Sequence, residues 1–252
     1  MKNIRVISRL YVKGSNLIKT IRFEGLRKVG NPNDFALKYF NDGIDEIIFI
    51  DIVASLYQRN NLDEILKKAA KNIFVPITVG GGIRNIDDAQ RLLRSGADKI
   101  AVNTAAIRNN NLIKELANSI GTQSLVISIE AKKNKSGFWE SYIDNGREKT
   151  GLNVLEWVET VEKFGAGEIL LTSVDREGTR NGFDLELIKL VSNKVNIPVV
   201  ACGGMRDFSC FHDVVKKSNA DAVAMSDCLH FNRINIKDIK ILALNNDINV
   251  RK

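Results

Sequence analysis

Two halves of this 252-residue chain repeat each other, and this narrows the possible folds more than any other feature. The repeated segments differ in residue type but keep the same glycines, apolar runs and spacing. The three pairs are 76–85 with 198–207, 97–103 with 220–226 and, more weakly, 43–46 with 165–168. Their offset is about 122 residues, nearly half the chain. A constant offset indicates an architecture built from two related halves that carry the same type of loop.

Short β-branched runs alternate with longer amphipathic segments along the whole chain, as in βα units with a parallel sheet. We expect strands at 4–10, 46–52, 76–79, 99–103, 124–129, 168–172, 198–201 and 222–225. We expect helices at 33–41, 62–71, 87–95, 111–120, 153–164, 185–192, 208–217 and 236–245. Eight such units predict one TIM-barrel domain, a (β/α)₈ barrel made of two half-barrels, over residues 1–252. A doubly wound open sheet competes, but no G-x-G-x-x-G follows the first strand.

The composition excludes several classes of protein. No apolar run approaches the roughly 20 residues of a membrane span, and no signal peptide is evident, so we expect a cytoplasmic protein. The three cysteines lack the spacing of a zinc site, so we expect neither a metal nor another cofactor. His212 and His230 accompany no obvious nucleophile, which argues against a triad hydrolase. The net charge of +7 suits a phosphorylated ligand, but scattered basic residues without interleaved aromatic residues do not indicate nucleic acid or membrane binding.

Glycine-rich loops end the third and the seventh predicted strand. Glycine lets backbone N–H groups approach an anion closely, and the loops after strands seven and eight form the common phosphate site of TIM barrels. Because the repeat places equivalent loops after strands three and four, we expect two phosphate pockets on opposite sides of the barrel mouth. Alternatively, the glycines only make tight turns. The candidate contacts are Gly82, Asn103 and Thr104 on one side, and Gly178, Gly204 and Ser226 on the other.

Four charged residues stand at or near the start of predicted strands. Arg5, Glu46, Lys99 and Glu168 comprise two cations and two anions, which could close a paired ring inside the barrel floor. TIM-barrel interiors are normally filled by branched apolar side chains, and buried charges are costly unless they pair. The alternative is that these strand starts are simply solvated.

Several motifs together resemble HisF, the cyclase subunit of imidazole glycerol phosphate synthase, along nearly the whole chain. They are Thr78–Ile83, Gly96–Lys99, Val102–Ala106, Gly165–Ser173, Asp175–Thr179 and His230-Phe231. The resemblance implies a heterodimer with a HisH-type glutaminase that docks under the barrel and supplies ammonia through it. At the mouth, ammonia cleaves and cyclises a bis-phosphate intermediate of histidine biosynthesis, which gives imidazole glycerol phosphate and an aminoimidazole carboxamide ribotide.

The same resemblance assigns roles to individual residues. It identifies the four floor charges with an ammonia gate and places Asp98 at the glutaminase interface. Lys19 and Asp51 match catalytic positions, Thr78 matches a substrate-binding position, and Glu177 stands near a phosphate loop where aspartate is common in the family. Cys202 stands where serine is frequent.

The two catalytic aspartates of the family are replaced in this sequence. Their positions hold Tyr11, after the first strand, and Glu130, after the fifth. Paired carboxylates suit the chemistry because one can protonate a leaving nitrogen while the other removes a proton during ring closure. Glutamate keeps the acid and moves it by one methylene group. Tyrosine, whose ordinary pKa is about 10, is a poor base at neutral pH.

These replacements keep two further functions open. A HisF-like branch is associated with surface-polysaccharide biosynthesis, in which the barrel delivers ammonia to a separate sugar amidotransferase. A non-catalytic regulatory barrel is the third possibility, which an intact floor ring disfavours. Two long segments after strands, 13–32 and 131–151, are candidate lids or partner-docking loops, or mere excursions of the chain. The second contains an Asn-Gly pair typical of a hairpin turn.

Overall fold

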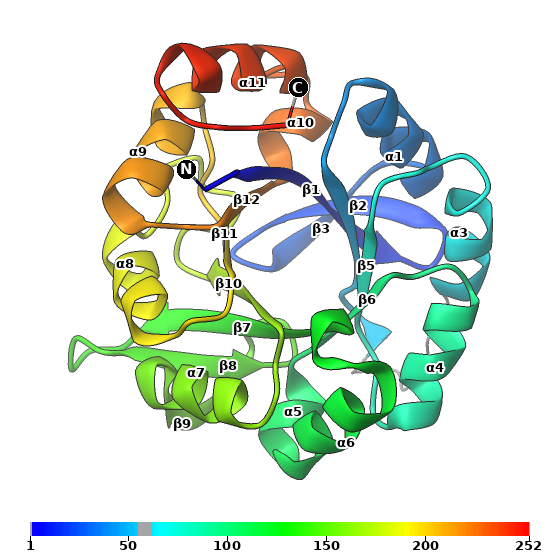
Figure 1. Cartoon of the computed structure of the whole chain (residues 1–252), viewed down its shortest axis with the longest axis vertical. Coiled ribbons are helices and arrows are strands. Elements are labelled where there is room, and N and C mark those ends of the chain that lie inside the picture. The colour runs from blue at the N-terminus through cyan, green and yellow to red at the C-terminus, as the bar shows by residue number, and fades with distance from the viewer. Residues whose placement is uncertain (1, 55–61, 252) are drawn as a thin grey trace.

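A computed structural model describes residues 2–54 and 62–251. Eight parallel strands surround a central axis, and pairing of β7 with β10 closes them into a barrel (Figure 1). This confirms the predicted TIM barrel. The strands are β1 (Arg5–Lys13), β4 (Glu46–Asp51), β5 (Ile77–Gly80), β6 (Lys99–Val102), β7 (Leu125–Lys133), β10 (Glu168–Ser173), β11 (Val199–Cys202) and β12 (Ala222–Met225).

Helices cover the outside of the barrel (Figure 1). They are α1 (Pro32–Asn41), α3 (Leu62–Ala69), α4 (Ile86–Arg94), α6 (Asn111–Ile120), α7 (Val154–Lys163), α8 (Leu185–Lys194), α9 (Phe208–Ser218) and α11 (Ile236–Asn245). All eight predicted helices are confirmed to within a few residues. Side chains cap several of them; those of Asn85, Asp184 and Asp207, for example, accept backbone N–H groups of the first turn. Within the described residues, no helix is both long and apolar enough to cross a bilayer.

The internal repeat is visible in the short elements as well. Helix α5 (Thr104–Arg108) follows β6, and α10 (Asp227–His230) follows β12. The residues that precede them, Asn103 and Ser226, have similar uncommon backbone angles, φ −127° and ψ −84° against φ −136° and ψ −78°. A 3₁₀ turn, η1 (Thr122–Ser124), leads into β7. The two halves thus build the same strand-to-helix junction twice.

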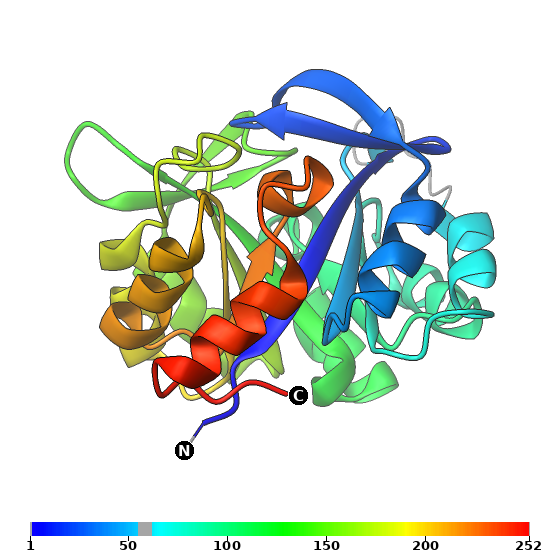
Figure 2. The same cartoon turned by 90° about the horizontal axis from the view of Figure 1, so that it is seen from above.

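Two hairpins stand on the mouth of the barrel, at the opposite end from the N-terminus (Figure 2). Strands β2 (Asn16–Ile21) and β3 (Glu24–Gly30) extend β1, and they occupy the predicted lid 13–32, whose strands the sequence pattern did not reveal. Strands β8 (Trp139–Ile143) and β9 (Glu148–Asn153) extend β7, which confirms the hairpin expected in 131–151.

Apolar side chains form two separate clusters. The larger lies between the strands and the helices, and the smaller fills the barrel interior with residues such as Ile7, Ile48, Val126, Leu170 and Val200. Because neighbouring residues of a strand point to opposite faces, one strand serves both clusters. The interior cluster lies between the floor and the mouth, so it separates two polar regions.

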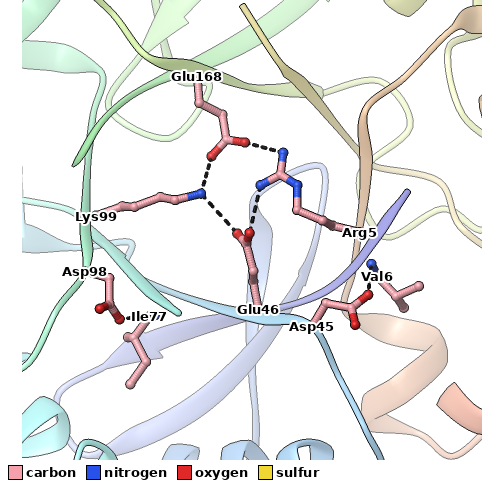
Figure 3. Close-up of polar contacts among 8 residues, drawn as sticks. All are labelled: Arg5, Val6, Asp45, Glu46, Ile77, Asp98, Lys99 and Glu168. Carbon is pink, nitrogen blue, oxygen red and sulfur yellow. Dashed lines mark hydrogen bonds and ion pairs between the residues drawn. The ribbon is translucent and has the colours of Figure 1, made fainter. Parts of the chain in front are cut away.

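Aspartates that precede strands tie the barrel floor together (Figure 3). The carboxylates of Asp45 and Asp98 accept the N–H groups of Val6 and Ile77 at 2.7 Å, and Asp221 accepts that of Val199 at 2.9 Å. Asp45 also binds Lys240 Nζ of α11 at 2.6 Å, and both residues are buried. This carboxylate therefore anchors the last helix to the first strand.

Asp45→Ala is expected to lower the free energy of unfolding by about 3–5 kcal/mol, because it leaves the Lys240 ammonium buried without its partner. Asp98→Ala removes an equivalent bond to the backbone but no buried cation, and should cost only about 1 kcal/mol. Urea denaturation of both variants measures the difference. Equal losses would show that Lys240 gains nothing from Asp45.

Candidate functional site

The floor of the barrel carries a closed ring of charge (Figure 3). Arg5 Nη1 lies 2.8 Å from Glu46, Lys99 Nζ lies 3.3 Å from Glu46 and 3.0 Å from Glu168, and Arg5 Nη2 also pairs with Glu168. Each carboxylate thus binds both cations. The glutamate side chains are only 7% and 8% exposed. The four charges predicted to meet do meet, and a pocket of about 450 Å³, lined in part by Arg5, Lys99 and Glu168, gives access to the ring.

A cavity of about 310 Å³ lies at the other end of the barrel. It brings together five of the predicted site residues, which come from the ends of four neighbouring strands. Gly81 and Gly82 turn its loop with φ of 102° and 71°, conformations that glycine adopts most easily. A Cβ on Gly81 would collide with the carbonyl oxygen of Asp51, so the loop packs tightly against β4. The predicted residues that line the cavity are Asp51, Gly82, Asn103, Thr104 and Glu130.

The second predicted phosphate pocket is much smaller, at about 20 Å³. The predicted residues do gather there, namely Lys19, Glu177, Gly178, Gly204 and Ser226. Lys19 of β2 forms a buried ion pair with Glu177 of the loop after β10, and these side chains are 5% and 3% exposed. Ser226 Oγ donates to the carbonyl oxygen of Arg9 at 2.8 Å. The two repeated loops therefore border two pockets. The first is open, and the Glu177 carboxylate, paired with Lys19, occupies the second.

Glu130 supplies a buried carboxylate to the larger cavity. Burial raises the pKa of this carboxyl to about 7, although the charge of Arg9 and the N–H group of Gly146 act in the opposite direction. The Gly146 N–H donates to Glu130 Oε2 at 2.7 Å. Burial also raises the pKa of Asp51, whose carboxylate accepts the N–H of Val53 at 3.0 Å. A group with a pKa near 7 can both give and take a proton at neutral pH.

Comparisons with known proteins agree with this geometry. A family model described as "Histidine biosynthesis protein" matches residues 5–235. The chain is 61% identical over 205 residues to the imidazole glycerol phosphate synthase subunit HisF of Legionella pneumophila, which covers 81% of this chain and 97% of that protein. The HisF subunits of Clostridium botulinum (strain Alaska E43) and Pyrococcus furiosus are 42% and 43% identical, over 100% and 98% of both chains respectively.

The chain belongs to the HisF family.

Tyr11 occupies the position at which the resemblance implies a catalytic aspartate. Its side chain is fully buried, the ring lies 4.7 Å from the guanidinium of Arg9 and 5.2 Å from Lys19 Nζ, and Phe23 packs edge-on at 5.8 Å. Its hydroxyl has no hydrogen-bond partner among the described residues. Burial raises the pKa of Tyr11 well above its ordinary value, so the phenol stays neutral and cannot act as a base.

Arg9 is a buried residue of the site that the sequence reading missed. Its Nη1 donates to Thr172 Oγ1 at 2.6 Å and to Cys202 Sγ at 3.1 Å, so the side chain spans the barrel interior from β1 to β10 and β11. Burial raises the pKa of the Cys202 thiol, which therefore remains a neutral partner. The sequence contains a signal for this position: Arg9 alternates with Arg5 and Tyr11 along β1, and alternate residues of a strand face the same side of the sheet.

Thr78 lies on β5 in register with Ile48 and Lys99, and it is not among the residues that line the two mouth cavities. The register places it deeper in the barrel, because only residues at the carboxyl ends of the strands reach the mouth. Its role in substrate binding stays a prediction. Asp98 is exposed on the floor, where its role at a partner interface stays a prediction.

The raised pKa of Glu130 should make stability depend on pH. The pKa of this carboxyl is about 7 in the folded state and 4.5 in the unfolded chain, so the folded state holds the proton more tightly. This contribution to stability is complete below pH 4.5 and is lost as the pH rises through 7. Glu130→Gln is therefore expected to gain about 3 kcal/mol relative to the unmodified protein between pH 4.5 and pH 8. Urea denaturation at both pH values measures this, with exposed Glu148→Gln as the control. A pH-independent difference would contradict the raised pKa.

Proposed function

We propose that this chain is the synthase subunit of a glutamine amidotransferase complex of the imidazole glycerol phosphate synthase type. A HisH-type glutaminase docks at the floor, its ammonia enters through the charge ring, and the mouth holds a phosphorylated substrate. The observation that carries the proposal is the closed ring of Arg5, Glu46, Lys99 and Glu168 at one end of a barrel whose other end bears the two glycine-loop pockets. The relatives are named as subunits, which agrees with an obligatory partner.

The ring suits a passage for neutral ammonia. It contains two cations and two anions in mutual contact, so a neutral molecule meets no uncompensated charge there. Above it, interior residues such as Ile7 and Leu170 form an apolar layer that strongly disfavours ammonium because a buried ion loses its hydration. Ammonia thus reaches the mouth as the nucleophilic, unprotonated species.

At the mouth, Glu130 and Asp51 are the candidate proton-transfer groups. They line one cavity with Gly82, Asn103 and Thr104, which would hold one phosphate of the substrate. The family reaction cleaves a bis-phosphate intermediate and closes an imidazole ring. Glu130 can protonate the leaving nitrogen and then accept a proton from the incoming one, since its pKa lies near 7. Lys19 and Gly204 would hold the other phosphate once Glu177 releases Lys19.

The decisive experiment is ammonium-driven turnover of the bis-phosphate histidine intermediate by the purified protein. Because Tyr11 replaces an acid–base group, we expect Tyr11→Asp to raise the rate by about 10²–10⁴-fold, and Tyr11→Asp with Glu130→Asp to raise it at least as much. Phe23→Leu, which also alters the packing around the Tyr11 ring but adds no acid, is the control. A rate unchanged by the added carboxylate would exclude Tyr11 as the limiting residue.

The role of the charge ring in ammonia passage can be tested separately. Lys99→Met leaves the ring with one uncompensated negative charge, which would hold ammonium at the floor. Glutamine-driven turnover in the complex should therefore fall by about tenfold relative to ammonium-driven turnover. Lys2→Met is the matched control, because Lys2 lines the same floor pocket but binds Asp221 and the carbonyl oxygen of Asn219. An equal ratio in both variants would remove the ring from the ammonia route.

A second candidate function rests on Tyr11. The buried, neutral phenol fills the place of a catalytic carboxylate while the floor ring stays complete. This combination suits a barrel that delivers ammonia to a separate sugar amidotransferase of surface-polysaccharide biosynthesis. Robust turnover of the histidine intermediate by the unmodified chain would exclude this candidate. Absent turnover, from a chain that still stimulates its glutaminase, would exclude the cyclase and favour ammonia delivery.

A further inference from the structure

The turn between β8 and β9 forms a fixed roof over the larger mouth cavity. Asp144, Asn145 and Gly146 follow one another with positive φ of 51°, 59° and 71°, so the chain reverses within three residues. Although this turn belongs to the hairpin that extends β7, Asn145 lines the cavity beneath it and is only 9% exposed. The turn therefore covers the cavity instead of pointing into solvent.

Contacts to two other walls hold the turn in this place. The Asn145 side-chain amide donates to the carbonyl oxygen of Ile52, just beyond the end of β4 and across the cavity. Asp144 donates its N–H to Thr104 Oγ1 at 3.2 Å and accepts from Arg108 at 3.1 Å, both on α5. The hairpin thus bridges β7, β4 and α5.

The bond to Ile52 fixes the direction of one peptide group. The N–H of Gly146 belongs to the peptide that joins it to Asn145, and a peptide group is planar. This N–H donates to Glu130 Oε2 at 2.7 Å. A backbone amide can orient a carboxylate only if the amide itself is held, and among the described contacts the Asn145 side chain is the nearest support.

We propose that Asn145 is the positioning residue for Glu130: by tying the hairpin turn to β4, it aims the Gly146 amide at the Glu130 carboxylate and keeps water away from it. This inference rests on the proposed function in one respect, namely that Glu130 takes part in proton transfer. The placement of the carboxylate and its seclusion from water can be measured without any reaction.

Several charged groups face Glu130 or its cavity. Arg9 approaches from β1 and favours the ionised carboxylate, while Asp144 from the hairpin opposes it. Asp51, Arg84 and Arg108 line the same cavity from β4, the loop after β5 and α5. A substitution at Asn145 replaces none of these groups. A changed titration of Glu130 therefore shows a change in the turn that covers the cavity.

The test uses Asn145→Gly in the full-length chain. Glycine tolerates the positive φ at this position, so the variant removes the amide without straining the backbone. Carbon-13 NMR of labelled glutamate carboxyl groups, with the Glu130 signal assigned through Glu130→Gln, follows its titration. We expect a midpoint near 7 in the unmodified protein and about 6 or lower in Asn145→Gly, because burial is the main cause of the raised pKa.

Arg147→Gly is the matched control, since it places a glycine one residue after Gly146 at an exposed position and removes no contact with the mouth. Its Glu130 titration should match that of the unmodified protein. In ammonium-driven turnover, Asn145→Gly should lower kcat by about 10²-fold with little change in KM, as expected when an acid–base group loses its position. Asn145→Gln, which keeps an amide donor, should recover part of both effects.

The outcomes distinguish the positioning role of Asn145 from the proton-transfer role of Glu130. An unchanged Glu130 titration in Asn145→Gly, or an equal change in Arg147→Gly, overturns the role of Asn145. A shifted titration in Asn145→Gly alone supports it even if the unmodified protein shows no turnover, and in that case only the proton-transfer role of Glu130 fails.

Discussion

Closure of the barrel by the pairing of β7 with β10 is the constraint on which the rest of the structure depends. Once eight strands close, alternate residues must face a shared axis, and residues from distant parts of the chain meet at the same level. Arg5 and Glu168 are far apart in sequence, yet closure makes them neighbours. Without it Glu168 of β10 and Lys99 of β6 would lie towards opposite ends of an open sheet, and the ring could not close. With it the four floor charges form one partly buried, electrically balanced ring.

The interior is therefore layered from floor to mouth. Paired charges at the floor give way to an apolar layer, and polar groups return at the mouth with Arg9, Tyr11 and Glu130. The two polar regions differ in how their charges are compensated. Each floor carboxylate binds two cations directly. Burial raises the pKa of Glu130 to about 7, because the charge of Arg9 and hydrogen bonds from the Gly146 N–H and the Asn103 side chain offset only part of it. The carboxyl whose pKa lies near 7 is thus at the mouth end of the barrel.

The two half-barrels share the same strand-to-helix arrangement and differ in their pockets at the mouth. Their strand-to-helix junctions keep matching backbone conformations at Asn103 and Ser226. One pocket is open to about 310 Å³, while the Lys19–Glu177 ion pair reduces the other to about 20 Å³. A hairpin borders each pocket: β2 brings Lys19 to the second, and the turn after β8 brings Asn145 to the first. Under the proposed function, a substrate with two phosphates would have to separate that pair to enter the second pocket.

The sequence by itself determined the barrel, its two halves, every barrel strand and the glycine loops that border both pockets. Period-two and helical patterns, together with a constant repeat offset, are local signals that need no knowledge of packing. Only the tertiary structure decided how deep a residue lies in the barrel and which distant side chains it meets there. It placed Thr78 in register with Lys99, set Arg9 in the interior and laid Asn145 across the cavity from β7 to β4. These positions depend on strand register and on long-range closure, and no short stretch of sequence encodes either.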